Sequence, residues 1–468
     1  MATIQDTELR QAILAAIDRA RENSHAVLVS EVQRIERVDP FNFFATGRKR
    51  FLGERFYWQN PKKSQILVGM GIAKQIQSNQ MGDRFADVEK QWEDLIDKAI
   101  LIGEEKELAT GPVIFGGFSF DPLKKKTGLW SKYEDALFHI PTFMLSVVNG
   151  QSFLTTNIIC TQQDDLRLFE RISKDRQFLL AITNQNQEFP YAPINRIIEV
   201  QPEEWKKSVS DLVRSLQSSE LKKVVLAREV RLFFDEKVEI ERTLSHLIAE
   251  QKESYIFAFE SCGDCFIGAT PERLVKIHGN EVFSTCLAGS IARGKTEEED
   301  RELGQTLLND QKNLIEHQYV VEMIKEAMDE TCEQISLPGH PKLLKTKHIQ
   351  HLYTPVVGKK RNGTSMFDLV NRLHPTPALG GFPKEAAVAE IRESEELDRG
   401  FYAAPIGWHD YRENGEFAVA IRSALVQGKE ASLFAGCGVV ADSDAESEFI
   451  ETRIKFQPML TALGGKWK

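Results

Sequence analysis

Residues 436–455, GCGVVADSDAESEFIETRIK, carry more information about the fold than any other stretch of this chain. Ser443 opens an S-x-x-E pattern typical of a capped helix start, so we expect a helix to begin just after it. On that helix Glu448, Glu451 and Lys455 are spaced to share one face. Two carboxylates and an ammonium beyond a glycine-rich turn predict a site for a metal ion and an anion. The alternative is an ordinary solvated helix face.

Composition and charge restrict the class of protein. The 468 residues are 42% hydrophobic and 27% charged, with a net charge of −10, which is typical of an acidic globular protein with a large core. No run of 18 apolar residues occurs, and the N-terminal segment lacks the pattern of a secretory signal. We expect a cytoplasmic protein that binds neither nucleic acid nor a membrane, because phosphate-rich partners need a basic surface. An anionic substrate would need local cations.

The six cysteines predict neither a disulfide framework nor a metal centre. They are scattered, and Cys262 and Cys265 form a C-x-x-C pair without a second pair or a histidine motif nearby. We expect both thiols to be small buried side chains.

The hydrophobic pattern indicates mixed α and β structure. The expected elements are an N-terminal helix with Leu9, Ile13 and Ile17 on its apolar face, strands and loops over 26–75, a helix over about 82–101 with Val88, Trp92, Leu95 and Ala99 on its apolar side, strands from 115 onward, a helix through 205–216 and a strand over 223–228. The polar stretch 185–202 is the expected boundary between an N-terminal part and the rest. The irregular alternation that follows favours α+β layers over a βαβ series.

Two charged residues lie near predicted strands. Lys223 begins the run KVVLAR, where a period of two puts Lys223 and Val225 on one face. Its side chain either reaches solvent at the strand end or lies in a cleft as a base. Glu272 follows Thr270 and Pro271, a pair typical of a helix N-cap and first position, so we expect it in a first helical turn. Together, Lys223 and Glu272 are a candidate base and acid.

Four further residues are candidates with structural alternatives. Glu316 lies in the predicted helix DQKNLIEH, where Lys312 makes an i,i+4 surface ion pair the alternative to a third carboxylate of the site. Arg422 ends the apolar run FAVAIR, and a buried arginine needs a partner such as a substrate carboxylate. His351 and His374 complete the set, although a lone histidine is more often structural.

Residues 289–296, GSIARGKT, satisfy the phosphate-loop pattern G-x-x-x-x-G-K-[ST]. A strand-like segment precedes them and a helix-like segment follows. However, the acidic run EEED directly behind Thr296 would repel phosphates, and the chain offers no good apolar strand that ends in a magnesium-binding aspartate. Nucleotide binding therefore remains a minor alternative.

The order of the motifs is more specific than any one of them. The series KVVLAR, TPERL, AGSxxRG, EH, HL, HPTPALGG, RGxYxAPxG, AIRS and GCGVVADSDAESEFxETxxK resembles the chorismate-utilising enzymes, which comprise the anthranilate, aminodeoxychorismate, salicylate and isochorismate synthases. The resemblance is dense over about 200–462, and the segment FGGFSFD at 115–121 resembles the isochorismate synthases in particular. The first six residues of GSIARGKT fall within this series, which makes the trailing Lys-Thr a coincidence.

The resemblance implies a single large α+β domain, similar to anthranilate synthase component I, with two packed β-sheets flanked by helices. Residues 1–200 would be a divergent N-terminal part of the fold, and residues 201–465 the chorismate-binding catalytic region. We expect a monomer or a weak homodimer that acts on a small molecule with Mg²⁺ as its cofactor.

The resemblance also assigns roles to the candidate residues. Lys223 is similar to the base that activates water and Glu272 to the acid that protonates the departing C4 hydroxyl. The remaining assignments are Glu316 and Glu451 as direct Mg²⁺ ligands with Glu448 near the metal, Tyr402, Arg422, Gly436 and Lys455 around the enolpyruvyl carboxylate, and His351 and Ala378 beside the ring.

The implied reaction is the Mg²⁺-dependent conversion of chorismate to isochorismate, an isomerase (hydroxymutase) activity that feeds menaquinone or siderophore synthesis. Water adds at C2 and the C4 hydroxyl leaves. Ala378 stands where the lyase members have threonine, which favours a synthase that does not eliminate pyruvate. A long N-terminal part favours the menaquinone branch.

The chain departs from the family pattern at Asn313, where an acid is frequent, at Ser290, which replaces a threonine, and at Cys437, which replaces a frequent alanine. Three alternatives remain: a salicylate synthase-type lyase of the same family, a nucleotide-binding protein that uses Gly289–Thr296, and a non-catalytic protein that kept the fold.

Overall fold

The computed structural model describes residues 4–79, 83–103, 107–182, 189–346 and 349–467. Its α-helices are α1 (Ile4–Asn23), α2 (Pro40–Phe51), α3 (Arg84–Ile96), α4 (Arg167–Ile182), α5 (Pro202–Leu216), α6 (Ile240–Glu250), α7 (Glu297–Asn309), α8 (Gln311–Thr331), α9 (Met366–Leu373), α10 (Lys384–Ser394) and α11 (Ala445–Ala462). None of these helices is both long and apolar enough to cross a membrane.

The strands of the described residues are β1 (Val27–Ile35), β2 (Arg55–Gln59), β3 (Gln65–Ser78), β4 (Ile100–Ile102), β5 (Val113–Phe118), β6 (Ala136–Val148), β7 (Gln151–Cys160), β8 (Ile194–Glu199), β9 (Lys223–Phe234), β10 (Tyr255–Ser261), β11 (Asp264–Thr270), β12 (Arg273–His278), β13 (Glu281–Ala292), β14 (Cys332–Ser336), β15 (Lys342–Lys345), β16 (Ile349–Lys360), β17 (Gly381–Phe382), β18 (Pro405–Asp410), β19 (Gly415–Val419), β20 (Ser423–Gln427) and β21 (Glu430–Val439).

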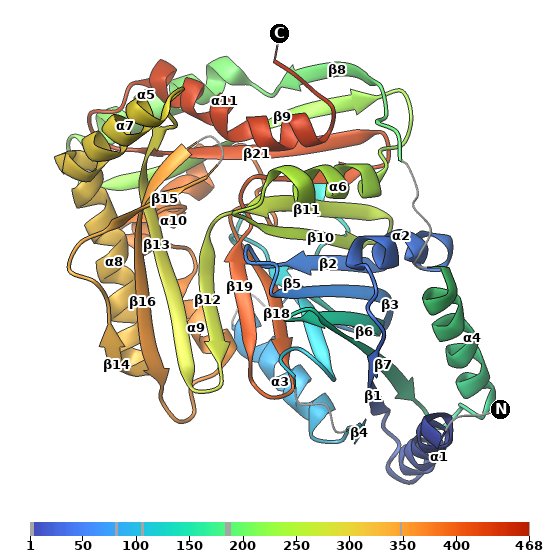
Figure 1. Ribbon diagram of the computed structural model, residues 1–468. Coiled ribbons are helices and arrows are strands. Elements are labelled where there is room, and N and C mark those ends of the chain that lie inside the picture. Colours follow the sequence, from blue (N-terminus) through green and yellow to red (C-terminus); the bar gives the residue numbers. More distant parts are fainter. Residues whose placement is uncertain (1–3, 80–82, 104–106, 183–188, 347–348, 468) are drawn as a thin grey trace.

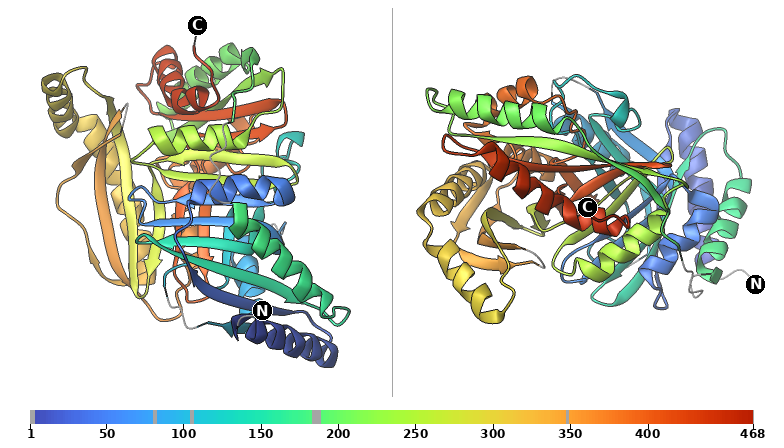
Figure 2. Two further views of the ribbon diagram at one scale, coloured as in Figure 1. Left: turned by 45° about the vertical axis from the view of Figure 1, so that its right-hand side comes forward. Right: turned by 90° about the horizontal axis from the view of Figure 1, so that it is seen from above.

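All of these strands join one hydrogen-bonded network that turns through the molecule. Strands β13 and β16 stand upright on one side of Figure 1, whereas β2, β3, β10 and β11 lie across the other side. The long ladders β3–β6, β9–β21 and β13–β16 are antiparallel, and β1 pairs with β4 in parallel. Helices cover the outer faces, and α11 packs on β21 (Figure 2). The predicted α+β class with one large domain is confirmed.

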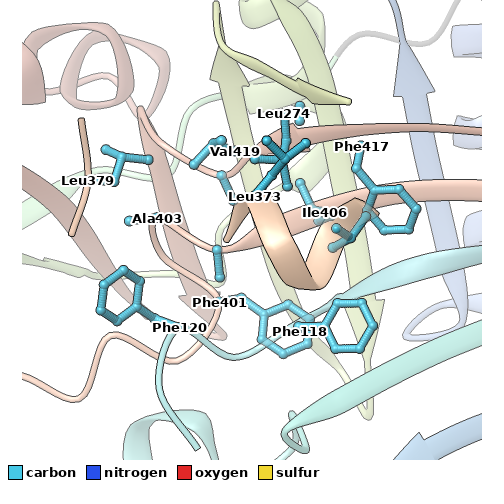
Figure 3. Packing of buried hydrophobic residues seen from close by; sticks show 14 of the residues in the cluster. Phe118, Phe120, Leu274, Leu373, Leu379, Phe401, Ala403, Ile406, Phe417 and Val419 are labelled. Carbon is cyan, nitrogen blue, oxygen red and sulfur yellow. The ribbon is translucent and has the colours of Figure 1, made fainter. Parts of the chain in front are cut away.

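The core follows from the strand period of two. Phe56 and Trp58 of β2 belong to one buried cluster, whereas Tyr57 between them belongs to a second cluster on the opposite face. Residues from β5, β12, β18 and β19 meet in the first cluster, part of which Figure 3 shows. The second cluster holds the buried face of α1, where Leu9, Ile13 and Ile17 are buried as predicted.

Several predicted elements need correction. The helix expected over 82–101 is the shorter α3, because Asp83 caps its start and Ala99 lies beyond its end. The segment 26–75 also contains α2, which begins at Pro40 behind a capping Asp39. Of the C-x-x-C pair only Cys265 is buried, since Cys262 lies exposed in the turn between β10 and β11. Residues 185–188 of the expected boundary lie outside the described residues.

A buried ion cluster ties α6, β2 and β10 together. The Arg55 side chain is fully buried; its Nη2 lies 2.6 Å from Glu260 Oε1 and its Nη1 lies 2.7 Å from Glu241 Oε1. Glu260 Oε2 also accepts a hydrogen bond of 2.8 Å from the backbone N–H of Gly53. The charges in this cluster are therefore stabilised by one another and by hydrogen bonds with the surrounding backbone.

Replacing Glu260 with alanine would leave Arg55 without its main partner. We expect the free energy of unfolding to fall by about 3–5 kcal/mol, the usual loss for one member of a buried pair. Urea denaturation followed by circular dichroism measures it. The control Asp329→Ala breaks an exposed pair with Lys325 and should change stability by less than about 1 kcal/mol. Equal effects of the two variants would contradict this account.

Candidate active site

A cavity of about 310 Å³ opens where β9, β21, α8 and α11 come together. All eleven residues to which the resemblance assigns a role line it: Lys223, Glu272, Glu316, His351, Ala378, Tyr402, Arg422, Gly436, Glu448, Glu451 and Lys455. The remaining candidate, His374, is not part of the cavity lining, and its Nε2 lies 2.9 Å from Phe120 O. They come from positions as far apart in the chain as β9 and α11, so only the tertiary fold brings them together.

The ladder between β9 and β21 sets the path of Lys223. Gly436 pairs with Ala227 and Gly438 with Val225, so both glycines share the face from which Lys223 projects. A Cβ atom on Gly438 would lie 2.5 Å from Lys223 Cε. The side chain is 7% exposed, and its Nζ lies 2.5 Å from Glu316 Oε1. Lys223 therefore points into the cavity, and the alternative of a lysine reaching solvent at the strand end is wrong.

Helix α8 presents Glu316 to the cavity. Asp310 caps the helix by accepting a hydrogen bond of 2.7 Å from Asn313 N. The His317 ring is fixed between Ala288 O, 2.9 Å from its Nδ1, and the Thr354 hydroxyl, 2.8 Å from its Nε2.

The alternative interpretation, a surface ion pair between Lys312 and Glu316, is wrong. Glu316 faces inward to Lys223, whereas Lys312 Nζ lies 3.3 Å from Asp442 at the mouth.

Helix α11 begins one residue later than predicted. Asp444 is the N-cap and accepts a hydrogen bond of 2.9 Å from Ser447 N. Ser443 instead donates to Glu448 Oε1 at 2.8 Å, so it holds a cavity carboxylate rather than the helix end. The predicted common face is confirmed, since Glu448, Glu451 and Lys455 all line the cavity.

Glu272 lies in the turn between β11 and β12, so the predicted first helical turn is wrong. Its N–H donates to the Thr270 hydroxyl at 3.2 Å, and its carbonyl accepts from Val419 N at 3.0 Å. These two bonds hold the backbone beside the sheet, where no helix can continue. Burial raises the pKa of the Glu272 carboxyl to about 7, although the nearby Lys223 lowers it. A carboxylic acid that keeps its proton near neutral pH is a proton donor.

Cationic and neutral donors line the cavity near these acids. Among the described residues Arg422 Nη1 is buried without a hydrogen-bond partner, and the Arg422 backbone has a φ of 52°. Such an atom calls for an acceptor, and a substrate carboxylate would supply one. Burial lowers the pKa of His351 to about 3, so its ring stays neutral. Burial also raises the pKa of Tyr402, which keeps its hydroxyl protonated.

The three remaining carboxylates of the cavity affect one another's pKa values, but each forms its hydrogen bond or ion pair with a different group. Glu451 pairs with Lys455 at 2.6 Å, and Lys455 Nζ also donates to Gly436 O at 2.9 Å. The Lys455 ammonium lowers the pKa of Glu451, and burial raises that of Glu448. Burial would raise the pKa of Glu316, but Lys223 outweighs it and the net pKa is lowered. In the described part of the chain, no three acidic, histidine or cysteine side chains are placed to hold a metal ion together.

The phosphate-loop pattern at 289–296 does not form a phosphate loop. Its first four residues belong to β13, and Thr296 caps α7. The N–H of Gly294 donates to Asp300 Oδ1 at 3.0 Å, and Arg293 Nε lies 2.6 Å from the same atom. Asp300 thus occupies the donors that a phosphate would need, while Lys295 is exposed.

Sequence reasoning missed Gly438, which borders the cavity beside Lys223. The signal was present, because the spacing G-x-G on a strand places both glycines on one face. The role of this spacing could not be inferred from the sequence, because it depends on the Lys223 side chain passing over that face.

The fold and the cavity together define an α+β enzyme whose cavity brings basic groups and acids together. The sequence model of the chorismate-binding enzymes matches residues 14–464, and the chain belongs to this family.

Two relatives match almost the whole chain. It is 45% identical to the isochorismate synthase MenF of Bacillus subtilis over 100% of this chain and 99% of the relative. It is 34% identical to the salicylate biosynthesis isochorismate synthase of Pseudomonas aeruginosa over 98% and 95% of the two chains. The solved structure of MenF, the menaquinone-specific isochorismate synthase from Escherichia coli, shares the fold with a TM-score of 0.77 at 23% identity, covering 97% of this chain and 100% of that one.

The Gly438→Ala variant tests the role of the ladder. The added methyl group would displace Lys223, so we expect kcat to fall about 100-fold, as a misplacement near 1 Å can cause. Steady-state kinetics measures the change, with circular dichroism to check folding. Gly339→Ala is the control, because a Cβ atom at that exposed position meets no other atom within 4 Å. Wild-type kcat in Gly438→Ala would refute the argument.

Proposed function

We propose that this chain is an isochorismate synthase, which converts chorismate to isochorismate. The observation that carries the proposal is a buried acid with a pKa of about 7, Glu272, in the same cavity as the buried amine of Lys223. The reaction needs one group that removes a proton from water and another that gives a proton to a leaving hydroxyl. The two full-length relatives with isochorismate synthase in their names support the assignment.

The proposed chemistry uses one water molecule and releases another. Lys223, as the neutral amine, takes a proton from water while the water oxygen forms a bond to C2 of the substrate. The ring double bonds shift, the C4–O bond breaks, and Glu272 gives its proton to the departing hydroxyl. Because Lys223 pairs with Glu316 in this structure, it must leave that carboxylate and lose a proton before it can act.

The substrate is a dianion, and the protein supplies cations for it locally. We assign Arg422, Tyr402, Lys455 and the backbone N–H of Gly436 to the enolpyruvyl carboxylate. The unpartnered Arg422 Nη1 supports this placement. His351 and Ala378 would line the ring.

The donor chemistry of the acids fits Mg²⁺. Glu316, Glu448 and Glu451 all line the cavity, and hard carboxylate oxygens are the ligands that this ion prefers. Within the described residues of this structure the three carboxylates are not placed to hold one ion together. When bound by Glu316 and Glu451, with Glu448 nearby, Mg²⁺ would neutralise and orient the ring carboxylate.

The wider setting follows the same proposal. The product would enter menaquinone synthesis, as the name of the Escherichia coli structure indicates for that enzyme. The enzyme would be cytoplasmic and a monomer or a weak homodimer. A net charge of −10 supports the further expectation that it engages neither nucleic acid nor membranes. Residues 201–465 would form the catalytic region and residues 1–200 a divergent part of the fold.

Product analysis tests the function directly. The pure protein with chorismate and Mg²⁺ should form isochorismate, seen by chromatography, and EDTA should stop the reaction. Lys223→Ala should lose at least about 100-fold in kcat, the share of a general base, whereas Lys295→Ala should keep wild-type activity. Salicylate and pyruvate as products would move the chain to the lyases. ATP hydrolysis that Lys295→Ala abolishes would support the nucleotide alternative.

The pH profile tests Glu272. Because its pKa is raised, Glu272 keeps its proton below about pH 7 and loses it as the pH rises further. We therefore expect kcat/KM to fall through pH 7 and above. Glu272→Gln should lose about 10²–10⁴-fold in kcat, and its residual activity should lack this limb. A limb near pH 7 that persists in the variant would exclude Glu272 as its source.

A further inference from the structure

A buried hydroxyl beside the proton donor has no formed hydrogen bond. Thr376 lies in the segment between α9 and β17 and is 5% exposed. Its carbonyl accepts hydrogen bonds from Leu379 N at 2.9 Å and Gly380 N at 2.8 Å, which hold the turn closed. Its Oγ1 is buried without a hydrogen-bond partner among the described residues. Buried polar groups rarely stay unsatisfied, so this hydroxyl requires an explanation.

The surroundings of Thr376 are apolar. Leu373 and Leu379 stand at either end of its turn, and both belong to the buried cluster that also holds Leu274 and Val419 (Figure 3). Glu272 lies two residues before Leu274, and its carbonyl accepts a bond from Val419 N. Ala378 and Leu379, which follow Thr376 in the same turn, line the cavity together with Glu272, so this turn borders the space that Glu272 faces.

The two side chains already interact. The Thr376 hydroxyl lowers the pKa of Glu272, second only to Lys223 among the groups that do so. The contact nevertheless falls short of the geometry of a formed hydrogen bond. A hydrogen bond from a hydroxyl in this position is strongest when the carboxyl is ionised, because hydrogen bonds to an ionised acceptor are shorter and stronger.

We propose that Thr376 is a positioning residue for Glu272, and that its hydroxyl donates a hydrogen bond to the carboxylate formed when Glu272 gives up its proton. This inference rests on the proposed function, in which Glu272 is the acid. No covalent bond forms at Thr376; the proton moves from Glu272 to the departing hydroxyl, and the Thr376 hydroxyl turns toward the charge left behind. The bond strengthens only as the reaction proceeds, so it accelerates the step rather than tightening substrate binding.

Other charged and titratable groups face Glu272. They are Lys223 on β9, Arg422 after β19, Lys455 on α11 and the Cys286 thiol on β13. Burial raises the pKa of that thiol, so it stays neutral. The three cations assist any nearby anion, including the substrate, whereas the Thr376 hydroxyl has no hydrogen-bond partner among the described residues and affects the pKa of Glu272. Its removal should therefore alter the acid selectively.

The test compares Thr376→Val with Thr376→Ser. Valine keeps the shape and removes the hydroxyl, so we expect kcat to fall about 10²-fold or more, as for the loss of one donor to a developing charge, with KM unchanged. The alkaline limb of kcat should move to higher pH, because the charged form of Glu272 loses a stabilising partner. Serine should restore both the rate and the limb. Thr331→Val is the control, since Thr331 is buried away from the cavity and donates to Ala327 O within α8.

A second readout needs no turnover. Infrared difference spectra of wild type against Glu272→Gln report the protonated carboxyl of Glu272 directly, and the midpoint should rise in Thr376→Val but not in Thr376→Ser or Thr331→Val. An unchanged midpoint in the valine variant would overturn the inference even if its activity fell. If the wild type forms no isochorismate but the midpoint shifts, the proposed function fails while the contact between Thr376 and Glu272 stands.

Discussion

The antiparallel ladder between β9 and β21 is the constraint on which the site depends. It places two glycines beside the face from which Lys223 projects, and it delivers the chain directly into α11. Since paired residues on adjacent strands face the same side, the register alone decides that Lys223 crosses Gly438. A shift of one residue would bring Cys437 or Val439 under the lysine and close the space it occupies. The carboxylates of α11 would then have no amine near them.

Burial and charge pairing together set the protonation states of several groups in the cavity. Glu272 keeps a proton near neutral pH because little solvent reaches it, whereas Glu316 stays ionised because Lys223 lies against it. His351 stays neutral for the same reason that Glu272 stays protonated. An acid, a base and neutral ring contacts can therefore coexist within about 310 Å³, although the protein as a whole is acidic. The cations needed for an anionic substrate are few but lie where it would bind.

The ion pair between Lys223 and Glu316 has a second consequence. One carboxylate serves two partners in the proposed scheme, the amine seen in this structure and the divalent ion expected during the reaction. Because Glu316 cannot fully satisfy both, binding of the ion and release of Lys223 would be linked. The same competition applies to Glu448 and Glu451. Ser443 and Lys455 contact carboxylate oxygens that a metal ion would also use.

Local sequence determined much of this molecule. The spacing of apolar residues predicted α1, α5 and the common face of Glu448, Glu451 and Lys455, because a helix repeats every 3.6 residues whatever surrounds it. The order of the motifs also predicted eleven of the residues that line the cavity, although it missed others such as Gly438. Other features were decided only by tertiary structure. Glu272 lies in a turn instead of a helix, and Glu316 pairs inward with a lysine 93 residues away. Asp300 accepts the hydrogen bonds that the phosphate-loop pattern would offer to a phosphate, and the hydroxyl of Thr376 is left without a hydrogen-bond partner among the described residues. Each depends on contacts between distant segments, and periodicity within one segment carries no information about which distant partner will compete for the same hydrogen bond or charge.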